Sequence, residues 1–283
     1  MKEYVNRLRP IFKHFIPDLV AGRSRASLKF LILGSLDSIL NKGEGYEQKK
    51  LLSRERWDVL VVLDACRYDY FYEEYEDFLN GELIKAYSPA SSTTPWLKKV
   101  FNGFYTDIKI FSATPWLNSK GVEVFGYNPI DHFPSKNIAD LWDYKWNEYL
   151  RTVHPKDIVE EVLNSTEDSK RKIIWFMQPH SPWIGKPRIL ISSSRVLIGA
   201  DEAIVPLIKK GEISLEKLRK AYRGNLRLVL KYVSKLTEET DSGNKIIVTS
   251  DHGELLGEYN SFGHFFWLTS PELREVPFMI IQK

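Results

Sequence analysis

Three short apolar runs, far apart in the chain, each end in a carboxylate or an imidazole. They read WDVLVVLD at residues 57–64, KIIWFMQPH at residues 172–180 and KIIVTSDH at residues 245–252. Continuous runs rich in β-branched residues are typical of strands that are buried on both faces of a sheet. Segments with helical apolar spacing lie between the runs, and the longest covers residues 214–240. This alternation predicts an α/β fold in which helices cover both faces of a mainly parallel or mixed sheet.

Weaker patterns complete the expected order of elements. Helices are expected over residues 65–79, 94–103 and 156–164, and a last strand is expected over residues 276–282. Gly103 is expected to close the second of these helices. The aromatic-rich stretch from Gly121 to Leu150 has no regular period, so we expect irregular structure there.

The N-terminal part of the chain has a different pattern. Basic and apolar residues are interleaved there, Pro10 and Pro17 interrupt them, and residues 27–40 have the apolar spacing of an amphipathic helix. Residues 41–50 are polar and predict a linker. We therefore divide the chain into a helical extension with its linker, residues 1–55, and one larger domain, residues 56–283. The extension is expected to pack on the core, and the alternative is a membrane-surface or partner-docking element formed by residues 1–40.

Composition limits the class of protein. The 283 residues are enough for one large core. A net charge of +3 gives no strong field for polyanions, so no nucleic-acid partner is expected. Cys66 is the only cysteine, which excludes an intrachain disulfide and a multi-cysteine zinc site. No secretory signal and no apolar run of about 18 residues is present, which predicts a cytoplasmic location, with peripheral membrane contact through the extension as an option.

The polar ends of the three apolar runs are the first candidates for a site. They are Asp64, His180, Asp251 and His252. Ligand sites in open α/β sheets form at the carboxyl ends of strands, so these side chains are expected to meet in one crevice. Two converging carboxylates would raise each other's pKa, and a divalent cation would remove that conflict. The alternative is that Asp64 caps a following helix and that Asp251 forms a capping box with Glu254.

Six segments follow one another in an informative order. They are VLDACRYDYF (62–71), TTPWLKKVFNG (93–103), FMQPHSPW (176–183), VTSDHGELLGE (248–258), FGH (262–264) and VPFMII (276–281). In this order they resemble the sulfatase-like branch of the alkaline phosphatase superfamily, from about Trp57 to the C-terminus. The resemblance implies an alkaline-phosphatase-like α/β core over residues 56–283.

The resemblance also implies a site, residue by residue. Asp64, Asp251 and His252 match the positions that bind a metal. Counting back from Gly103, with Pro95 on the family's proline, the covalent nucleophile falls on Thr93, which also contacts the metal. Thr94, Ser91 and Ser92 are the alternatives for that nucleophile.

Further positions match groups that contact the substrate. His180 of the PHSP segment and His264, which follows the Asp-His pair by about a dozen positions, match residues that contact the transferred group. Arg67 is a candidate for a phosphate contact, with a salt bridge to an acidic residue as the alternative. His132 is expected to be a loop histidine with no metal role, and Cys66 a packed apolar residue.

The implied function is a metal-dependent hydrolase or transferase of phosphate mono- or diesters that works through a phospho-threonine intermediate. The cofactor is expected to be one divalent ion, manganese or zinc first, calcium or magnesium as alternatives. The substrate is expected to be a small anionic phosphoester, lipid- or sugar-linked. Residues 93–97 read TTPWL and lack the Cys or Ser and the Arg of the sulfatase motif. A sulfoester hydrolase is therefore the alternative, and a non-catalytic binding protein with the same fold is a second one.

Overall fold

The computed structural model describes residues 45–166, 171–190, 200–264 and 268–283. Its strands are β1 Tyr46–Glu47, β2 Val59–Leu63, β3 Glu82–Tyr87, β4 Ile108–Ser112, β5 Ile138–Asp140, β6 Arg171–Phe176, β7 Lys245–Thr249, β8 Leu255–Leu256, β9 Phe262–Gly263 and β10 Glu275–Gln282. Its α-helices are α3 Gln48–Arg54, α4 Tyr68–Glu74, α5 Thr93–Val100, α6 Leu141–Tyr144, α7 Pro155–Asn164, α8 Ala200–Lys209, α9 Leu215–Glu239 and α10 Pro271–Arg274. The amphipathic helix predicted for residues 27–40 lies outside the described residues.

The main sheet has eight strands in the order β1-β3-β10-β7-β2-β6-β4-β5. Strand β2 pairs in parallel with β6 on one side and with β7 on the other. Strand β10 is antiparallel to both of its neighbours, β3 and β7. The sheet is therefore mixed and mainly parallel, as the alternation of strands and helices predicted.

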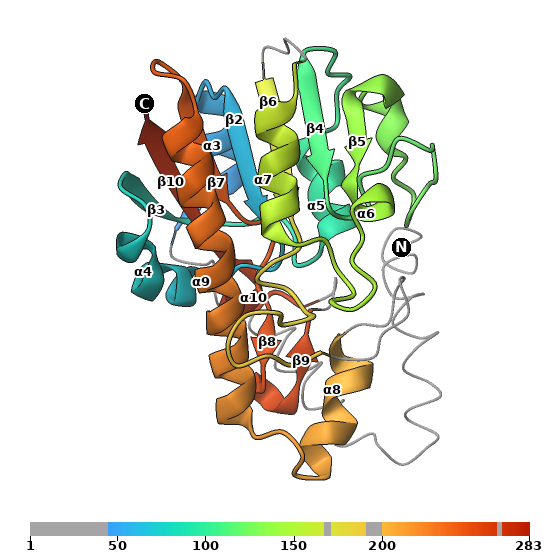
Figure 1. The fold of residues 1–283 in the computed structure, drawn as a ribbon, viewed down its shortest axis with the longest axis vertical. Helices are drawn as coiled ribbons and strands as arrows, with labels where there is room; N and C mark the ends of the chain where they lie inside the picture. Colours follow the sequence, from blue (N-terminus) through green and yellow to red (C-terminus); the bar gives the residue numbers. More distant parts are fainter. Residues whose placement is uncertain (1–44, 167–170, 191–199, 265–267) are drawn as a thin grey trace, which may run out of the picture. The chain divides into compact units, whose positions relative to one another are not determined.

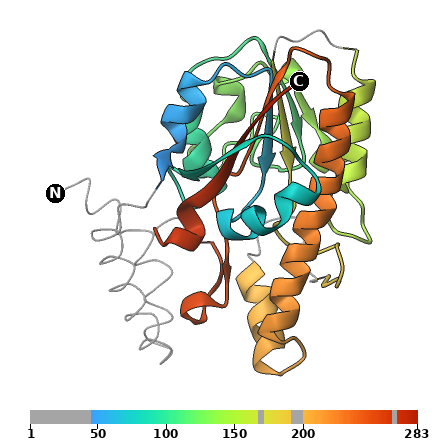
Figure 2. The same ribbon diagram turned by 90° about the vertical axis from the view of Figure 1, so that its left-hand side faces the viewer.

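The side chains of β2 alternate between two cores, as expected for a strand with helices on both sides. Val61 and Leu63 belong to the core that α7 and α9 cover. Leu60 and Val62 belong to the core that α3 and α5 cover. Figures 1 and 2 show these helix pairs on opposite faces of the sheet. All four side chains are fully buried, which explains why this stretch has no polar face.

The structure differs from the sequence prediction at several elements. Strands β3, β4 and β5 were not expected, and β5 lies inside the stretch predicted to be irregular. The expected linker becomes β1 and the start of α3 from residue 46 onward. There the buried side chain of Gln48 donates hydrogen bonds to Thr249 Oγ1 and the Ser250 carbonyl. Helix α5 ends at Val100, before Gly103, and the buried Phe101 follows it.

A third, smaller core lies beyond the carboxyl ends of the parallel strands. It joins α8, the first turns of α9 and the β8–β9 hairpin around Trp183, Tyr222 and Leu256. In Figure 1, α9 runs from this core along the whole height of the sheet. This helix therefore contacts both the sheet core and the loops at the carboxyl edge.

Candidate metal centre

Two neighbouring strands bring the candidate metal ligands together. Asp64 follows β2, and Asp251 and His252 follow β7, which pairs with β2. One ligand atom from each of the three side chains lies within 4.8 Å of the other two. All three side chains are buried, with exposed fractions of 2%, 0% and 0%. The convergence expected from the strand ends is therefore present in the fold.

Neither aspartate caps a helix. Helix α4 begins only at Tyr68 with Arg67 as its N-cap, and the segment after Asp251 leads into strand β8. The Asp64 carboxylate instead accepts a hydrogen bond from Trp175 Nε1 at 3.2 Å. Asp251 Oδ1 accepts the backbone N–H groups of Ala65 at 3.1 Å and His252 at 3.0 Å. The capping alternative is therefore excluded for both residues.

Thr93 contacts this group of ligands from the first position of α5. Its Oγ1 donates a hydrogen bond to Asp251 Oδ2 at 2.8 Å and lies 3.3 Å from His252 Nε2. Ser92, one of the alternatives for the nucleophile, is the N-cap residue of the helix. The structure thus brings the Thr93 hydroxyl, rather than the N-cap position, to the candidate metal ligands.

Burial and neighbouring charged side chains shift the pKa values of the three candidate ligands. Burial and the neighbouring Asp251 carboxylate raise the pKa of Asp64 to about 7. Burial opposes ionisation of Asp251, but the charge and hydrogen bond of His252 lower its pKa. Burial opposes protonation of His252, but Asp251 and Asp64 raise its pKa to about 9. Two carboxylates, an imidazole and a hydroxyl oxygen fit a divalent cation, which would relieve the conflict between the carboxylates.

His180 and His264 lie beside the metal ligands. The ring centroid of His264 is 4.1 Å from that of His252 and 5.4 Å from that of His180. The Nδ1 of His180 lies 2.8 Å from the Ser181 carbonyl, and its Nε2 lies 3.6 Å from Glu254 Oε1. Burial lowers the pKa of His264 well below its usual value, and the positive charges of His252 and His180 lower it further. The imidazoles of His180 and His264 therefore lie close enough to the metal ligands to contact a substrate bound there.

Glu254 lies beside His180 at the site, which the sequence analysis did not predict. Its side chain is fully buried, and neither carboxylate oxygen has a hydrogen-bond partner among the described residues. Burial is the main cause that raises its pKa, and His180 opposes that shift. Its place in the SDHGE segment, two residues after the candidate ligand His252, could have indicated this position. The sequence analysis considered Glu254 only as the second residue of a capping box.

Other predicted residues lie in different surroundings. The Arg67 guanidinium forms ion pairs with Asp69 at 2.6 Å and Glu258 at 2.8 Å. These ion pairs are the salt bridges of the alternative reading, and the phosphate contact of Arg67 stays a prediction. His132 stacks on Tyr127 with ring centroids 4.6 Å apart. Cys66 is fully buried in the core that α9 covers.

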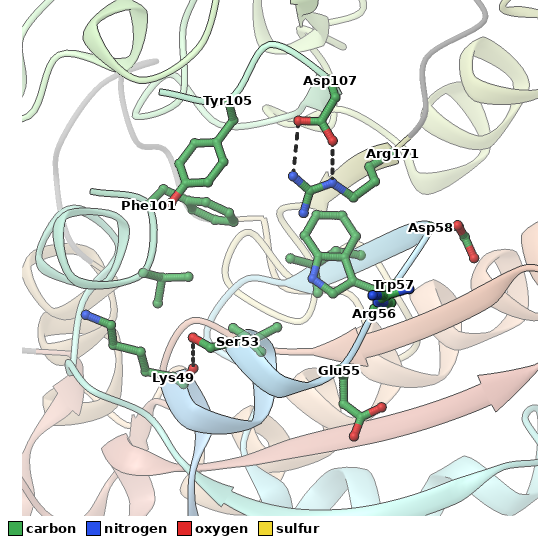
Figure 3. A pocket seen from close by; sticks show the side chains of 13 residues that line it. Lys49, Ser53, Glu55, Arg56, Trp57, Asp58, Phe101, Tyr105, Asp107 and Arg171 are labelled. Carbon is green, nitrogen blue, oxygen red and sulfur yellow. Dashed lines mark hydrogen bonds and ion pairs between the residues drawn. The ribbon is translucent and has the colours of Figure 1, made fainter. Parts of the chain in front are cut away.

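A cavity of about 760 Å³ lies at the amino ends of the parallel strands, the end of the sheet opposite to the candidate metal centre. Figure 3 shows its lining, which includes Trp57 before β2 and Arg171 at the start of β6. Arg171 pairs with Asp107 at 2.8 Å and lies over the Trp57 ring. These residues are at the amino ends of the parallel strands, so this cavity is separate from the candidate metal centre.

Comparison with known proteins gives matches only by structure. No family model and no curated protein matches the sequence. The soluble domain of lipooligosaccharide phosphoethanolamine transferase A from Neisseria meningitidis matches with a TM-score of 0.53 at 14% identity, over 84% of this chain and 77% of that one. The integral membrane protein itself matches with a TM-score of 0.52 at 14% identity, over 99% of this chain. The chain spans 58% of the length of that membrane protein.

A third matching structure is that of a hydrolase rather than a transferase. It is a phosphonate monoester hydrolase from Agrobacterium radiobacter, with a TM-score of 0.50 at 13% identity, over 80% of this chain and 68% of that one.

The comparisons contradict the cytoplasmic location expected from the sequence. Two of the matching structures are an integral membrane protein and its soluble domain, so that expectation was wrong. Among the described helices, none has both the length and the apolar content needed to cross a bilayer. The mixed sheet and these structural matches show that the chain has an alkaline-phosphatase-like α/β fold, which it shares with the matched transferase domain and the phosphonate monoester hydrolase.

Proposed function

We propose that this protein is a metal-dependent hydrolase or transferase of phosphate mono- or diesters, with Thr93 as its covalent nucleophile. One observation supports this most directly. The Thr93 hydroxyl hydrogen-bonds to Asp251 inside a buried group whose three ligand atoms lie within 4.8 Å of one another. Asp64, Asp251, His252 and the Thr93 oxygen would hold one divalent ion. When bound, this ion lowers the pKa of the hydroxyl and neutralises charge on a phosphoryl oxygen.

The chain's own residues account for the remaining chemistry. Thr93 is the first residue of the eight-residue helix α5, whose N–H groups favour an anionic phosphoryl oxygen. The Thr93 oxygen forms a bond to phosphorus while the bond from phosphorus to the leaving oxygen breaks. The Thr93 proton passes to a carboxylate of the site. The pKa of His264 is lowered by burial, so this side chain donates a hydrogen bond to the developing charge. Burial opposes protonation of His180, but Glu254 and Asp64 raise its pKa, so His180 donates a proton to the leaving oxygen.

The second step returns the enzyme to its starting state. Water, or an alcohol in a transferase, attacks phosphorus and gives its proton to the same histidine. The bond between phosphorus and the Thr93 oxygen breaks, and that oxygen takes back its proton. Each step exchanges one P–O bond for another, so no oxidant or reductant is needed.

The structural matches favour phosphorus chemistry. The names of the matched proteins describe transfer of a phosphoethanolamine group and hydrolysis of a phosphonate monoester. A lipid- or sugar-linked phosphoester is the substrate class that we propose for this chain. The TTPWL segment at residues 93–97 lacks the residues of the sulfatase motif, which makes a sulfoester substrate the weaker candidate.

Side-by-side assays test the proposal. Metal content is measured first, because a binding protein without catalysis could also hold the ion. The protein is then assayed with p-nitrophenyl phosphate, bis-p-nitrophenyl phosphate and p-nitrophenyl sulfate. We expect phosphoester turnover that chelation abolishes and that Thr93→Ala abolishes, while the neighbouring control Thr94→Ala retains it. Mass spectrometry of acid-quenched protein should show a phosphate on Thr93, and full turnover by Thr93→Ala would refute this nucleophile.

A further inference from the structure

Two buried polar side chains on α9 contact the loops of the candidate site without belonging to it. Tyr222 and Asn225 lie three positions apart on the helix, and both are fully buried. Residues with this spacing lie on the same face of a helix. Most side chains on the buried face of α9 are apolar, so two polar groups there need a reason.

Asn225 holds the loop that carries His180. Its Oδ1 accepts the backbone N–H groups of Ile184 at 2.9 Å and Gly185 at 3.0 Å. Its Nδ2 donates to the carbonyls of Pro179 at 3.2 Å, His180 at 3.0 Å and Pro182 at 3.2 Å. The amide therefore uses its full hydrogen-bonding capacity on one short loop.

The same loop lies directly against the backbone of α9. A Cβ atom on Gly224 would lie 2.1 Å from the Lys186 carbonyl oxygen. A Cβ atom on Gly185 would lie 2.3 Å from the Gly224 carbonyl. Neither position has room for a side chain, so the loop and the helix meet through their main chains. This close approach brings the Asn225 amide within reach of five backbone groups.

Tyr222 holds the turn that begins with Asp64. Its hydroxyl donates to the Ala65 carbonyl at 2.7 Å and accepts the Arg67 N–H at 2.9 Å. Ala65 has a φ of +56°, a left-handed conformation that a residue with a Cβ rarely adopts. The Tyr222 hydroxyl thus bridges the two sides of a strained turn that directly follows a candidate metal ligand.

The two loops are also joined to each other. The His180 N–H donates to the Asp64 carbonyl at 3.2 Å. We infer that Tyr222 and Asn225 are positioning residues, which set the Asp64 carboxylate and the His180 imidazole relative to each other. Asn225 acts through His180, and Tyr222 acts through Asp64. The effect on turnover rests on the proposed function, whereas the effect on the loops and on metal binding does not.

Two variants test the two halves of this inference in the full-length protein. Asn225→Asp keeps the side-chain volume and the acceptor but loses the three donor bonds. We expect its kcat on p-nitrophenyl phosphate to fall about 10- to 100-fold, the usual effect of losing a group that orients a site residue. Its KM and its zinc affinity, measured by chelator competition, should stay within about twofold. Tyr222→Phe should instead weaken zinc binding by about 10- to 100-fold.

A matched control separates positioning from stability. Val229 is fully buried on the same helix but packs in the sheet core. Val229→Ala should lower the melting temperature and leave kcat and zinc affinity unchanged at temperatures where the protein is folded. When His180 is already replaced by alanine, adding Asn225→Asp should lower kcat by less than about a further twofold. The reason is that the residue through which Asn225 acts is absent. A full additional loss there, or an equal kcat loss in Val229→Ala, would overturn the inference.

Hydrogen exchange gives a readout that needs no activity. Exchange of residues 177–186 should accelerate in Asn225→Asp, and exchange of residues 64–68 should accelerate in Tyr222→Phe. If the wild-type protein hydrolyses none of the three substrates, the proposed function fails. The positioning inference is then decided by hydrogen exchange in both variants and by the zinc affinity of Tyr222→Phe. Unchanged exchange in both variants, together with an unchanged zinc affinity in Tyr222→Phe, refutes it. If Asn225→Asp does not fold, Gly224→Ala replaces it, because its Cβ would push the same loop away from α9.

Discussion

Replacing Asp64 by asparagine should stabilise the metal-free protein and abolish its response to metal. Burial and the neighbouring Asp251 raise the pKa of Asp64 from 3.8 to about 7. Because the folded pKa is raised, the contribution of this group to stability is fully present below pH 3.8 and is lost as the pH rises toward 7. About three pKa units correspond to about 4 kcal/mol, which is the upper limit of what Asp64→Asn can recover above pH 7.

The structure indicates why asparagine is tolerated at this position. Trp175 Nε1 donates to Asp64 Oδ2, and an amide oxygen can accept the same bond. The asparagine side chain carries no negative charge, so its repulsion with Asp251 is removed. We therefore expect a gain of about 1–4 kcal/mol in the free energy of unfolding at pH 8 in the presence of chelator, and little gain near pH 4.

Urea denaturation with and without metal checks this prediction. Metal at about 1,000 times its dissociation constant should stabilise the wild type by about 4 kcal/mol, because only the folded state holds the ligands together. The same metal concentration should leave Asp64→Asn nearly unchanged, so the order of stability of the two proteins reverses between chelator and metal. If Asp64→Asn is less stable than wild type in chelator at pH 8, the charge conflict at this group has been misjudged.

Three further outcomes follow from the structure. Gln48→Leu should cost about 2–3 kcal/mol in urea denaturation, because it removes the buried partner of Trp96 Nε1 and of the Ser250 carbonyl; a neutral result would mean that α3 is not part of the folded core. Arg67→Met should cost about 1–3 kcal/mol, because it removes the partner of the half-buried Glu258 carboxylate and of the buried Glu254 carbonyl, and it should not alter KM for p-nitrophenyl phosphate; a raised KM would instead support the predicted phosphate contact. Dialysis against chelator should lower the melting temperature, and added manganese or zinc should restore it; an unchanged melting temperature would argue against a metal site.

The three buried strands and the long helix could be predicted from local sequence patterns alone. The runs at residues 57–64, 172–180 and 245–252 read correctly as buried strands because burial on both faces leaves no polar position in the run. The long helix read correctly because its apolar residues repeat with the helical period. Short strands such as β5, and α3 within a polar stretch, have too few residues to show a period, so only the neighbours that pair with them reveal them.

Local chemistry was also ambiguous wherever a side chain had two possible partners. Asp64 could have capped a helix, and nothing in the sequence shows that α4 starts only at Tyr68. Arg67 could have met a phosphate, and nothing near it in sequence identifies Glu258 as a partner. Glu254 looked like a capping residue for the same reason.

The fold class and the polar groups that end the strands follow from local sequence patterns, because strand and helix periods are properties of neighbouring residues. Three further features are visible only in the folded chain: β2 lies between β6 and β7, the Thr93 hydroxyl contacts Asp251, and one face of α9 contacts both site loops. Strand order and the contacts between distant segments depend on the packing of the whole chain, which no local pattern encodes.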